Sequence, residues 1–237
     1  MLLLTNDDGI DAPGLAALLH AVHSHDHLIV APRREMSECS HCVTTKRPLL
    51  IEQHGPRRYT VDGTPADCVR VAILHLLPEL GIDVRRNNVR VLSGINAGGN
   101  LGADIYISGT VAAAREAAFF GLEAVALSQY RRAVPAEREW RQAAAWARDV
   151  LDILEPQRLN VGEFWNVNFP WREPHDHRQP PAIEFCERSR RPLPVKYDRT
   201  AEGLSYVRDR YHLREFEPGS DIDICFGGDI AISRIAI

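Results

Sequence analysis

The chain has 237 residues, of which 45% are apolar, so it is long enough to bury a substantial hydrophobic core. Its formal net charge of −4 argues against a nucleic-acid polymer or an anionic membrane as a partner. The apolar run 1–4 is too short for a signal peptide, and no later run approaches the length of a transmembrane helix. We therefore expect a soluble cytoplasmic protein with no membrane partner.

The first predicted elements alternate between strand and helix. Residues 2–5 form a short apolar strand, and an acidic turn at 6–9 follows it. Pro13 opens a helix with apolar residues at i, i+3, i+4 and i+7, namely Leu15, Leu18, Leu19 and Val22. The run 28–31 then predicts a second buried strand, which Pro32 ends.

The alternation continues through the middle of the chain. Thr64 and Pro65 are typical of a helix N-cap and first position, and this helix continues to Leu76. Further strands are predicted at 89–92 and 125–127. One further helix starts at Ser108 and ends near Gly121, and another spans 137–154. This pattern predicts a mostly parallel sheet in a three-layer arrangement.

The pattern changes from about residue 160 onward. Four segments alternate between polar and apolar residues with period two and are separated by glycine-rich turns: 165–169, 204–207, 221–226 and 229–235. We interpret them as strands of a β-rich extension. The polar, proline-flanked stretch 175–179 is predicted to be a loop.

The five cysteines are odd in number, which fits reduced thiols better than a disulfide framework. Cys39 and Cys42 have CxxC spacing, with His41 between them. A zinc site would need a second pair of ligands, and no matching Cys/His pair follows at the usual distance. We therefore do not expect zinc or redox chemistry at this motif.

The acidic turn Asn6-Asp7-Asp8-Gly9 is the most informative feature of the chain. Ligands of open α/β sheets bind just outside the carboxyl ends of the strands. Two adjacent aspartates repel each other unless a positive charge lies between them, and a divalent cation is the natural counter-charge. The alternative interpretation is that the pair only caps the following helix, because Asp and Gly are ordinary turn residues.

Two further turns supply oxygen donors and backbone N–H groups. Residues 93–100 offer amide oxygens and a flexible backbone, and Ser108-Gly109-Thr110 form a helix start, which favours an anion such as phosphate. Taken alone, Ser108 is typical of a helix N-cap, and Asn96 is typical of a residue whose side chain forms the hydrogen bonds of a tight turn. Together, Asp, Asn and Ser oxygens suit Mg²⁺ or Mn²⁺ rather than zinc.

Two common phosphate motifs are absent from the sequence. It contains no G-x-x-x-x-G-K-[ST] loop, and no G-x-G-x-x-G follows a predicted strand. Kinase chemistry and dinucleotide-dependent redox chemistry are therefore disfavoured. Metal-assisted transfer of a phosphoryl group to water is the reaction that the three turns favour.

These motifs resemble those of the SurE family of metal-dependent nucleotidases, the stationary-phase survival proteins. The similar blocks occur in the family's order at 4–14, 63–69, 93–102, 108–111 and 165–170. The resemblance covers roughly residues 1–170 well and the remainder loosely. Because several long motifs recur in the same order, it is highly specific.

The resemblance implies one SurE-like α/β domain over residues 1–237. Its parts would be a Rossmann-like three-layer core at 1–160 and a smaller β-rich extension at 161–237 that makes oligomer contacts. It also implies a 5′/3′-nucleotidase that hydrolyses nucleoside monophosphates to nucleoside and phosphate. The cofactor would be one divalent ion per subunit, Mg²⁺ or Mn²⁺, and the assembly a homodimer or homotetramer.

Carried over residue by residue, the resemblance also assigns the site. The metal ligands would be Asp7, Asp8, Ser37 and Asn96, and Asp7, Asp8 and Asn96 would also be catalytic. The residues that bind the substrate phosphate would be Asn6, Gly9, Gly94, Ser108, Gly109 and Thr110.

The chain departs from the family pattern in several places. In the loop after the second strand, Arg33 replaces an acid and Glu38 replaces a glycine. Before the Ser-Gly-Thr motif, Ile107 replaces a tyrosine. The sequence also stops at Ile237, where the family typically continues. These departures bear on the Ser37 contact, substrate preference and oligomer geometry, but not on the acidic pair.

In the mechanism that we expect, a cation held by Asp7, Asp8 and Asn96 would polarise the phosphoryl group and lower the pKa of a bound water. That water, or one oriented by a free carboxylate oxygen of Asp8, would attack phosphorus, and the helix start at 108–110 would stabilise the equatorial oxygens. A haloacid-dehalogenase-type phosphatase is disfavoured, because it needs a nucleophilic Asp where Asn6 stands. The main alternative is a non-catalytic nucleotide- or metal-binding member of the family that has lost turnover. A purely structural role has no positive motif. Nucleoside 5′- and 3′-monophosphates, short polyphosphate and other small esters are all compatible substrates.

Overall fold

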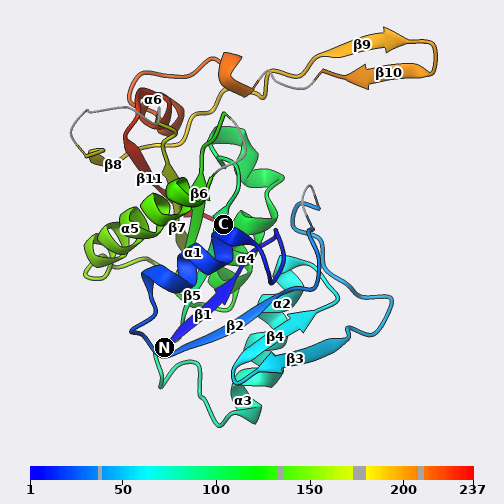
Figure 1. Cartoon of the computed structure of the whole chain (residues 1–237), viewed down its shortest axis with the longest axis vertical. Helices are drawn as coiled ribbons and strands as arrows, with labels where there is room; N and C mark the ends of the chain where they lie inside the picture. The colour runs from blue at the N-terminus through cyan, green and yellow to red at the C-terminus, as the bar shows by residue number, and fades with distance from the viewer. Residues whose placement is uncertain (37–38, 133–135, 173–179, 208–210) are drawn as a thin grey trace.

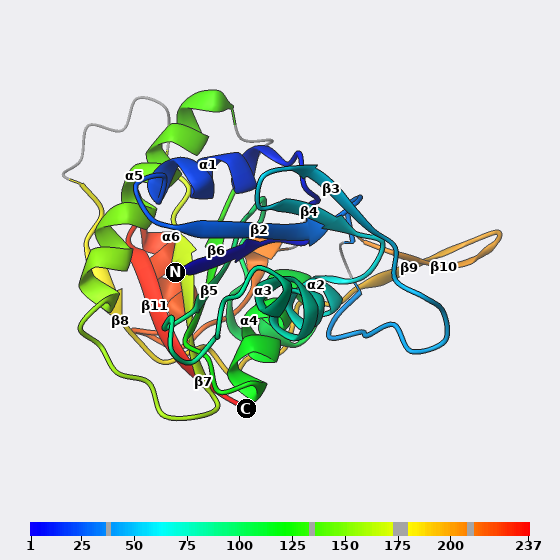
Figure 2. The ribbon, with the colours of Figure 1, turned by 90° about the horizontal axis from the view of Figure 1, so that it is seen from below.

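The computed structural model describes residues 1–36, 39–132, 136–172, 180–207 and 211–237. Its centre is a nine-stranded sheet with the order β3-β4-β2-β1-β5-β6-β7-β11-β8, and helices lie on both faces (Figures 1 and 2). Five neighbouring strands are parallel: β2 (His27–Pro32), β1 (Leu2–Thr5), β5 (Arg90–Asn96), β6 (Ala124–Gln129) and β7 (Glu163–Phe169). The predicted α/β class with a mostly parallel sheet is confirmed.

The remaining strands extend this parallel centre on both sides. On one side β4 (Arg58–Val61) is parallel to β2, and β3 (Ile51–Gly55) pairs antiparallel with β4. On the other side β11 (Ile230–Ala236) is antiparallel to β7, and β8 (Ile183–Phe185) is parallel to β11. The hairpin of β3 and β4 was not among the predicted elements.

The core has two halves, one on each face of the sheet. Successive strand residues point to opposite faces, so Leu4 packs in one half and Leu3 in the other. Helices α1 (Pro13–Ala21) and α5 (Glu137–Leu154) cover the face of Leu4. Helices α2 (Pro65–Val71) and α4 (Gly109–Phe119) cover the face of Leu3 (Figure 2).

The helix predicted at Thr64 begins as the sequence indicated. The Thr64 hydroxyl accepts a hydrogen bond from the Asp67 backbone N–H at 3.2 Å, and the Asp67 carboxylate accepts one from the Thr64 N–H at 3.0 Å. After α2 the helical path continues through η1 (Ala72–Leu76), which has π-helical hydrogen bonding, and α3 (Leu77–Glu79). The capping signal was therefore sufficient to locate this helix.

The C-terminal part of the chain differs from the prediction in one element. Residues 221–226 were predicted to be a strand, and this is wrong, because they lie in helix α6 (Asp221–Gly227). The Ser220 hydroxyl caps its start by accepting from the Asp223 N–H, and Gly228 ends it with a φ of 102°. Its buried residues are Asp221, Ile222 and Cys225, and the apolar pair Ile222 and Cys225 has the three-residue spacing of one helix face.

The other C-terminal predictions can be compared with the strands that form. Segments 165–169 and 229–235 correspond to β7 and β11, which lie inside the nine-stranded sheet although both follow residue 160. Segment 204–207 corresponds to β10 (Gly203–Tyr206), which pairs with β9 (Tyr197–Thr200) in a separate hairpin that projects from the body (Figure 1). The predicted loop at 175–179 lies outside the described residues.

Three short elements complete the chain: the 3₁₀ helices η2 (Gly102–Tyr106) and η3 (Tyr211–Leu213), and α3 described above. Within the described ranges, no helix combines the length and the apolar character needed to cross a bilayer.

Candidate active site

The carboxyl ends of the parallel strands meet at one edge of the sheet. The acidic turn 6–9 follows β1, residues 33–36 follow β2, residues 97–100 follow β5, and residues 130–132 follow β6. The strand register places Thr5 beside Ser93, so the turn after β1 lies next to the last residues of β5. This is the edge at which open α/β sheets bind their ligands.

Asp7 is buried at the centre of this edge. Its Oδ1 accepts a hydrogen bond from the Thr110 hydroxyl at 2.5 Å, and its carbonyl oxygen accepts one from the Met36 N–H at 2.8 Å. A Cβ on Gly109 would lie 2.9 Å from Asp7 Oδ2, so a residue with a side chain at position 109 would clash with this carboxylate. The start of α4 is thus packed directly against Asp7.

Asp8 is half-buried and faces the end of β5. Its Oδ2 accepts a hydrogen bond from the Ala97 N–H at 3.3 Å. Asn96 precedes that residue, and its Nδ2 donates to the Gly98 carbonyl oxygen at 2.8 Å. The structure therefore brings together Asp7, Asp8 and Asn96, the three predicted catalytic residues.

Asn6 and Gly9 shape the acidic turn. Asn6 Nδ2 donates to the Gly9 carbonyl oxygen at 2.8 Å, and the buried Asn6 Oδ1 has no hydrogen-bond donor among the described residues. Gly9 has a φ of 100°, and a Cβ there would lie 3.3 Å from the Arg34 backbone. The loop after β2 therefore lies against the turn.

Ser37, a predicted metal ligand, lies outside the described residues, as does Glu38. Arg33, which departs from the family pattern, points away from the acidic turn: its Nη1 pairs with Glu52 Oε1 of β3 at 3.0 Å. Glu35 does act on the acidic pair, because its charge raises the pKa of Asp8. The described part of this loop thus adds a third carboxylate near the pair.

The other predicted phosphate-binding residues have identified structural contacts. Ser108 is the N-cap of α4, and its Oγ accepts from the Val111 N–H at 3.1 Å. Gly94 lies inside β5, where a Cβ would come within 2.3 Å of the Leu127 carbonyl oxygen, so glycine permits the close approach of β6. Direct binding of substrate by Asn6, Gly9, Gly94, Ser108, Gly109 and Thr110 stays a prediction.

Burial controls the electrostatics of the acidic pair. Desolvation, followed by the charge of Asp8, raises the pKa of Asp7 from 3.8 to about 6, although the Thr110 hydrogen bonds oppose this shift. Desolvation also raises the pKa of Asp8, against the Ala97 hydrogen bond and the positive charge of Arg131. Two adjacent carboxylates in this environment would be stabilised by a cation.

The oxygen donors at this edge fit a hard divalent ion. Among the described residues, the hydrogen bonds of Asp8 and Asn96 use Asp8 Oδ2 and Asn96 Nδ2, so Asp8 Oδ1 and Asn96 Oδ1 remain for a cation. Within the described ranges there is no cluster of three or more His, Cys, Asp or Glu side chains suited to a metal. A site here would therefore combine two carboxylates with amide and hydroxyl oxygens, a donor set typical of Mg²⁺ or Mn²⁺.

A cavity of about 490 Å³ lies beside the acidic pair. Ala97, which holds Asp8, and Arg131, which lowers its pKa, both contribute to the wall. The complete lining is Ala97, Gly98, Gly99, Tyr130, Arg131, Arg132, Tyr211 and His212. Its volume is in the range of small-molecule sites.

Sequence reasoning missed the cationic wall of this cavity. Arg131 and Arg132 directly follow the residues at the end of β6, so the strand-edge rule could have found them. Tyr211 and His212 come from the C-terminal part, where no local pattern marks them. Tyr211 reaches the site because its hydroxyl donates to the Gly99 carbonyl oxygen at 2.9 Å.

The asparagine-rich segment of β7 supports the turn after β5. The Asn100 N–H donates to Asn168 Oδ1 at 2.7 Å, and Asn166 Nδ2 donates to the Asn100 carbonyl oxygen at 2.9 Å. Asn100 Nδ2 also donates to the Ser128 hydroxyl at 2.7 Å. These buried contacts fix the segment that carries Asn96 and the glycines of the cavity wall.

The CxxC segment contacts α4 rather than the acidic pair. His41 Nε2 lies 2.7 Å from Glu116 Oε2, and Arg70 Nε donates to Glu116 Oε1 at 2.6 Å. Cys39 and Cys42 are free thiols. The His41–Glu116 pair therefore anchors the segment that follows the undescribed Ser37.

Comparisons with known proteins identify relatives of this chain. The family model "Survival protein SurE" matches residues 2–193. A putative 5′-nucleotidase of a Nostoc species is 45% identical over 236 residues, which cover 100% of this chain and 99% of that protein. The 5′-nucleotidase SurE of Paramagnetospirillum magneticum is 35% identical over 240 residues, which cover 99% of this chain and 88% of that protein.

The fold is also similar to a solved structure. The crystal structure of the SurE protein from Aquifex aeolicus superposes with a TM-score of 0.83 at 29% sequence identity. The match covers 99% of this chain and 92% of that one. The chain therefore shares its fold with a protein of known structure over nearly its whole length.

Proposed function

Because the chain belongs to the SurE family, we propose that it is a metal-dependent nucleotidase that hydrolyses nucleoside 5′-monophosphates, and also 3′-monophosphates, to nucleoside and phosphate. The observation that carries this proposal is the desolvated pair Asp7 and Asp8 beside a cavity with a cationic wall. The pair favours a divalent ion, and the cavity is large enough for a nucleoside.

Asp7, Asp8 and Asn96 would hold the ion, together with Ser37 of the adjoining loop. A bound Mg²⁺ or Mn²⁺ supplies a Lewis acid for the phosphoryl group and lowers the pKa of water. Thr110 and Gly109 fix the position of the Asp7 carboxylate, and the Ala97 N–H fixes that of Asp8. These contacts hold both carboxylates in place before substrate binds, which reduces reorganisation during the reaction.

Arg131 would act on the substrate. It lines the cavity, and its positive charge opposes the rise in the pKa of Asp8 that desolvation causes. In this position it can pair with the non-bridging oxygens of a phosphate bound at the acidic pair. Arg132 lies over the Trp171 ring, 4.9 Å from its centroid, so it forms a fixed part of the same wall. The nucleoside would occupy the cavity between this wall and Tyr211.

The test is phosphate release from a panel of nucleoside 5′- and 3′-monophosphates with Mg²⁺, Mn²⁺ or EDTA. We expect release that requires metal and falls by orders of magnitude in Asp7→Asn and Asp8→Asn. Asp11→Asn is the matched control, because Asp11 is exposed and pairs with Arg58 away from the site. Release that persists in EDTA or in both active-site variants would contradict the metal assignment. Nucleotide binding without release would support the non-catalytic alternative.

A further inference from the structure

A second cavity, of about 290 Å³, lies at the opposite edge of the sheet from the acidic pair. Leu2 and Arg90 line it at the starts of β1 and β5, whereas Asp7 and Asn96 lie at the far ends of the same strands. Val22 and Leu151 contribute the last parts of α1 and α5. This cavity is therefore separate from the candidate active site by the length of the strands.

Arg90 is the charged residue that is best buried in this cavity. Its side chain is only 15% exposed, and burial lowers the pKa of its guanidinium. The buried Nε has no hydrogen-bond acceptor among the described residues, because Glu123 Oε2 lies 3.8 Å away. A buried charged donor without an acceptor is costly, so this group favours a ligand that brings an oxygen to it.

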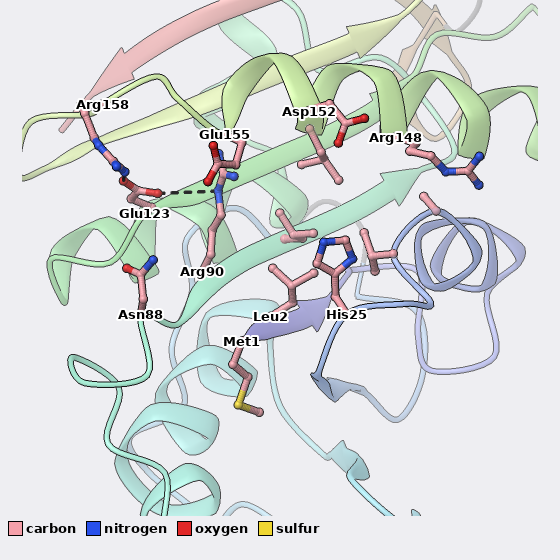
Figure 3. Close-up of a pocket in the computed structure, with 14 residues that line it drawn as sticks. Met1, Leu2, His25, Asn88, Arg90, Glu123, Arg148, Asp152, Glu155 and Arg158 are labelled. Atoms are coloured by element: carbon pink, nitrogen blue, oxygen red, sulfur yellow. Dashed lines mark ion pairs between the residues drawn. The ribbon is translucent and has the colours of Figure 1, made fainter.

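The neighbouring charges leave the Arg90 Nε without a hydrogen bond, although Arg90 forms an ion pair with Glu123 and the negative charge of Glu155 also acts on it. Glu123 is shared, since its Oε1 also lies 3.6 Å from Arg158 Nη1. Asp152 and Glu155 are exposed and can be hydrated, and Arg148 has no ion pair or hydrogen bond with any described residue. Figure 3 shows Arg90, Glu155 and Arg158 at one end of the cavity and Arg148 and Asp152, both from α5, at the other.

Much of the remaining lining is apolar, although His25 and Asn88 also contribute to it. Leu2, Leu92, Val22 and Leu151 contribute hydrocarbon side chains between the two charged ends. The volume lies near the lower end of the range for small-molecule sites, so it suits a compact ligand rather than a nucleotide. A charged head beside Arg90 and an apolar body on these leucines would match both parts of the lining.

We propose that this cavity is a second ligand site, which binds a small organic anion whose oxygen accepts a hydrogen bond from Arg90 and whose apolar body packs on Leu2 and Leu92. Arg148, at the other end of the cavity, adds a second positive charge that acts on the anion over a distance rather than by contact. The site is independent of the nucleotidase proposal, because none of its residues contacts the acidic pair.

The experiment is a titration of the full chain with benzoate, followed by NMR of the Arg90 Nε–Hε resonance. Benzamide has nearly the same shape and no charge, and it serves as the matched ligand control. We expect benzoate to shift this resonance with a Kd on the order of 1 mM, and benzamide to leave it unchanged.

Variants locate the binding site. Arg90→Met should weaken benzoate binding by about tenfold, because it removes the charged donor beside the carboxylate. Arg148→Met should weaken it by a smaller factor, about threefold, because this charge acts from the other end of the cavity. Arg141→Met, on the same helix but with a highly exposed side chain, is the control and should bind normally. If Arg90→Met does not fold, the wild-type resonance and Arg148→Met decide the result.

Three results would overturn the proposal. The first is an Arg90 resonance that benzoate does not move. The second is an equal response to benzamide, which would remove the role of charge. The third is binding that Arg131→Met abolishes and Arg148→Met leaves intact, because the anion would then occupy the cavity beside the acidic pair.

Discussion

Asp7 combines a functional position with a cost in stability. Its carboxyl is desolvated and adjacent to Asp8, and both effects oppose ionisation. Without a cation, the folded protein therefore favours the protonated form more strongly than the unfolded chain does. The protonated Asp7 carboxyl therefore contributes its full stabilisation of the metal-free fold below about pH 4. This stabilisation is lost as the pH rises through about 6.

We predict that Asp7→Asn stabilises the metal-free protein at pH 8 but not at pH 4. The shift from 3.8 to about 6 corresponds to about 3 kcal/mol at most, because one pKa unit is worth about 1.4 kcal/mol. The asparagine keeps an oxygen that can accept from Thr110. Urea denaturation in EDTA at both pH values measures the difference.

Asp11→Asn is again the control, since the side chain of Asp11 is 91% exposed. It should change the free energy of unfolding little at either pH. Equal stability of Asp7→Asn and wild type at pH 8 would show that burial does not raise the Asp7 pKa. Addition of Mg²⁺ should reverse the order of stability, because only the wild-type pair would bind it well.

Among the secondary-structure elements, η3 supplies part of the cavity wall and is held there by buried contacts. Arg214, directly after η3, donates to both oxygens of Asp104 in η2, at 2.8 and 3.0 Å. The Tyr211 hydroxyl lies 2.7 Å from Asp104 Oδ2 and 2.9 Å from the Gly99 carbonyl oxygen, so these two acceptors share its single proton. The Tyr211 ring lies against the Arg214 guanidinium. This buried cluster ties the C-terminal part to the turn that carries the cavity wall.

We predict that Tyr211→Phe raises KM for the nucleotide more than it lowers kcat. The change removes one hydroxyl that holds Gly99, but it leaves the acidic pair untouched.

Arg214→Met should destabilise the fold by about 3 to 5 kcal/mol, because it leaves the Asp104 carboxylate buried without its ion-pair partner. Steady-state kinetics and thermal unfolding measure the two effects.

Tyr106→Phe provides the comparison for the tyrosine variant. Tyr106 is exposed, and its hydroxyl accepts from Arg188 Nη2 at the surface. The KM of the Tyr106→Phe variant for the nucleotide should stay at the wild-type value. A drop in kcat with unchanged KM in Tyr211→Phe would show that η3 supports the reaction step rather than the nucleoside cavity.

At the scale of the whole molecule, a hairpin in the described part of the chain does not pack on the body. The hairpin of β9 and β10 is fully exposed along both strands and projects away from the sheet (Figure 1). It nevertheless carries the apolar side chains Tyr197, Leu204 and Tyr206, each more than half exposed. A two-stranded hairpin is marginally stable alone in water, so these side chains are suited to contact with a second copy of the chain.

We predict that replacement of residues 197–206 by a short Gly-Ser linker lowers the oligomeric state. Loss of the exposed apolar hairpin should reduce the molar mass in solution without unfolding the main sheet. Light scattering after size-exclusion chromatography measures the mass, and circular dichroism verifies the fold. An unchanged mass would place the oligomer contacts elsewhere.

The sequence by itself determined the fold class and the core of the candidate site, because the signals for both are local. The spacing of apolar residues gave the helices at 13–22 and 137–154, and the cap at Thr64 located α2. The acidic turn was identified from a strand followed by two aspartates. The order of the motifs was enough to identify the family.

Only the tertiary structure decided how the site is built and where the C-terminal residues lie. Thr110 meets Asp7 across 103 positions, Ala97 meets Asp8 across 89, and Arg214 meets Asp104 across 110. Segment 221–226 also became a helix, although its alternation favoured a strand. Such contacts depend on the paths of connecting segments and on the free energy of burying side chains together, and no local pattern encodes either.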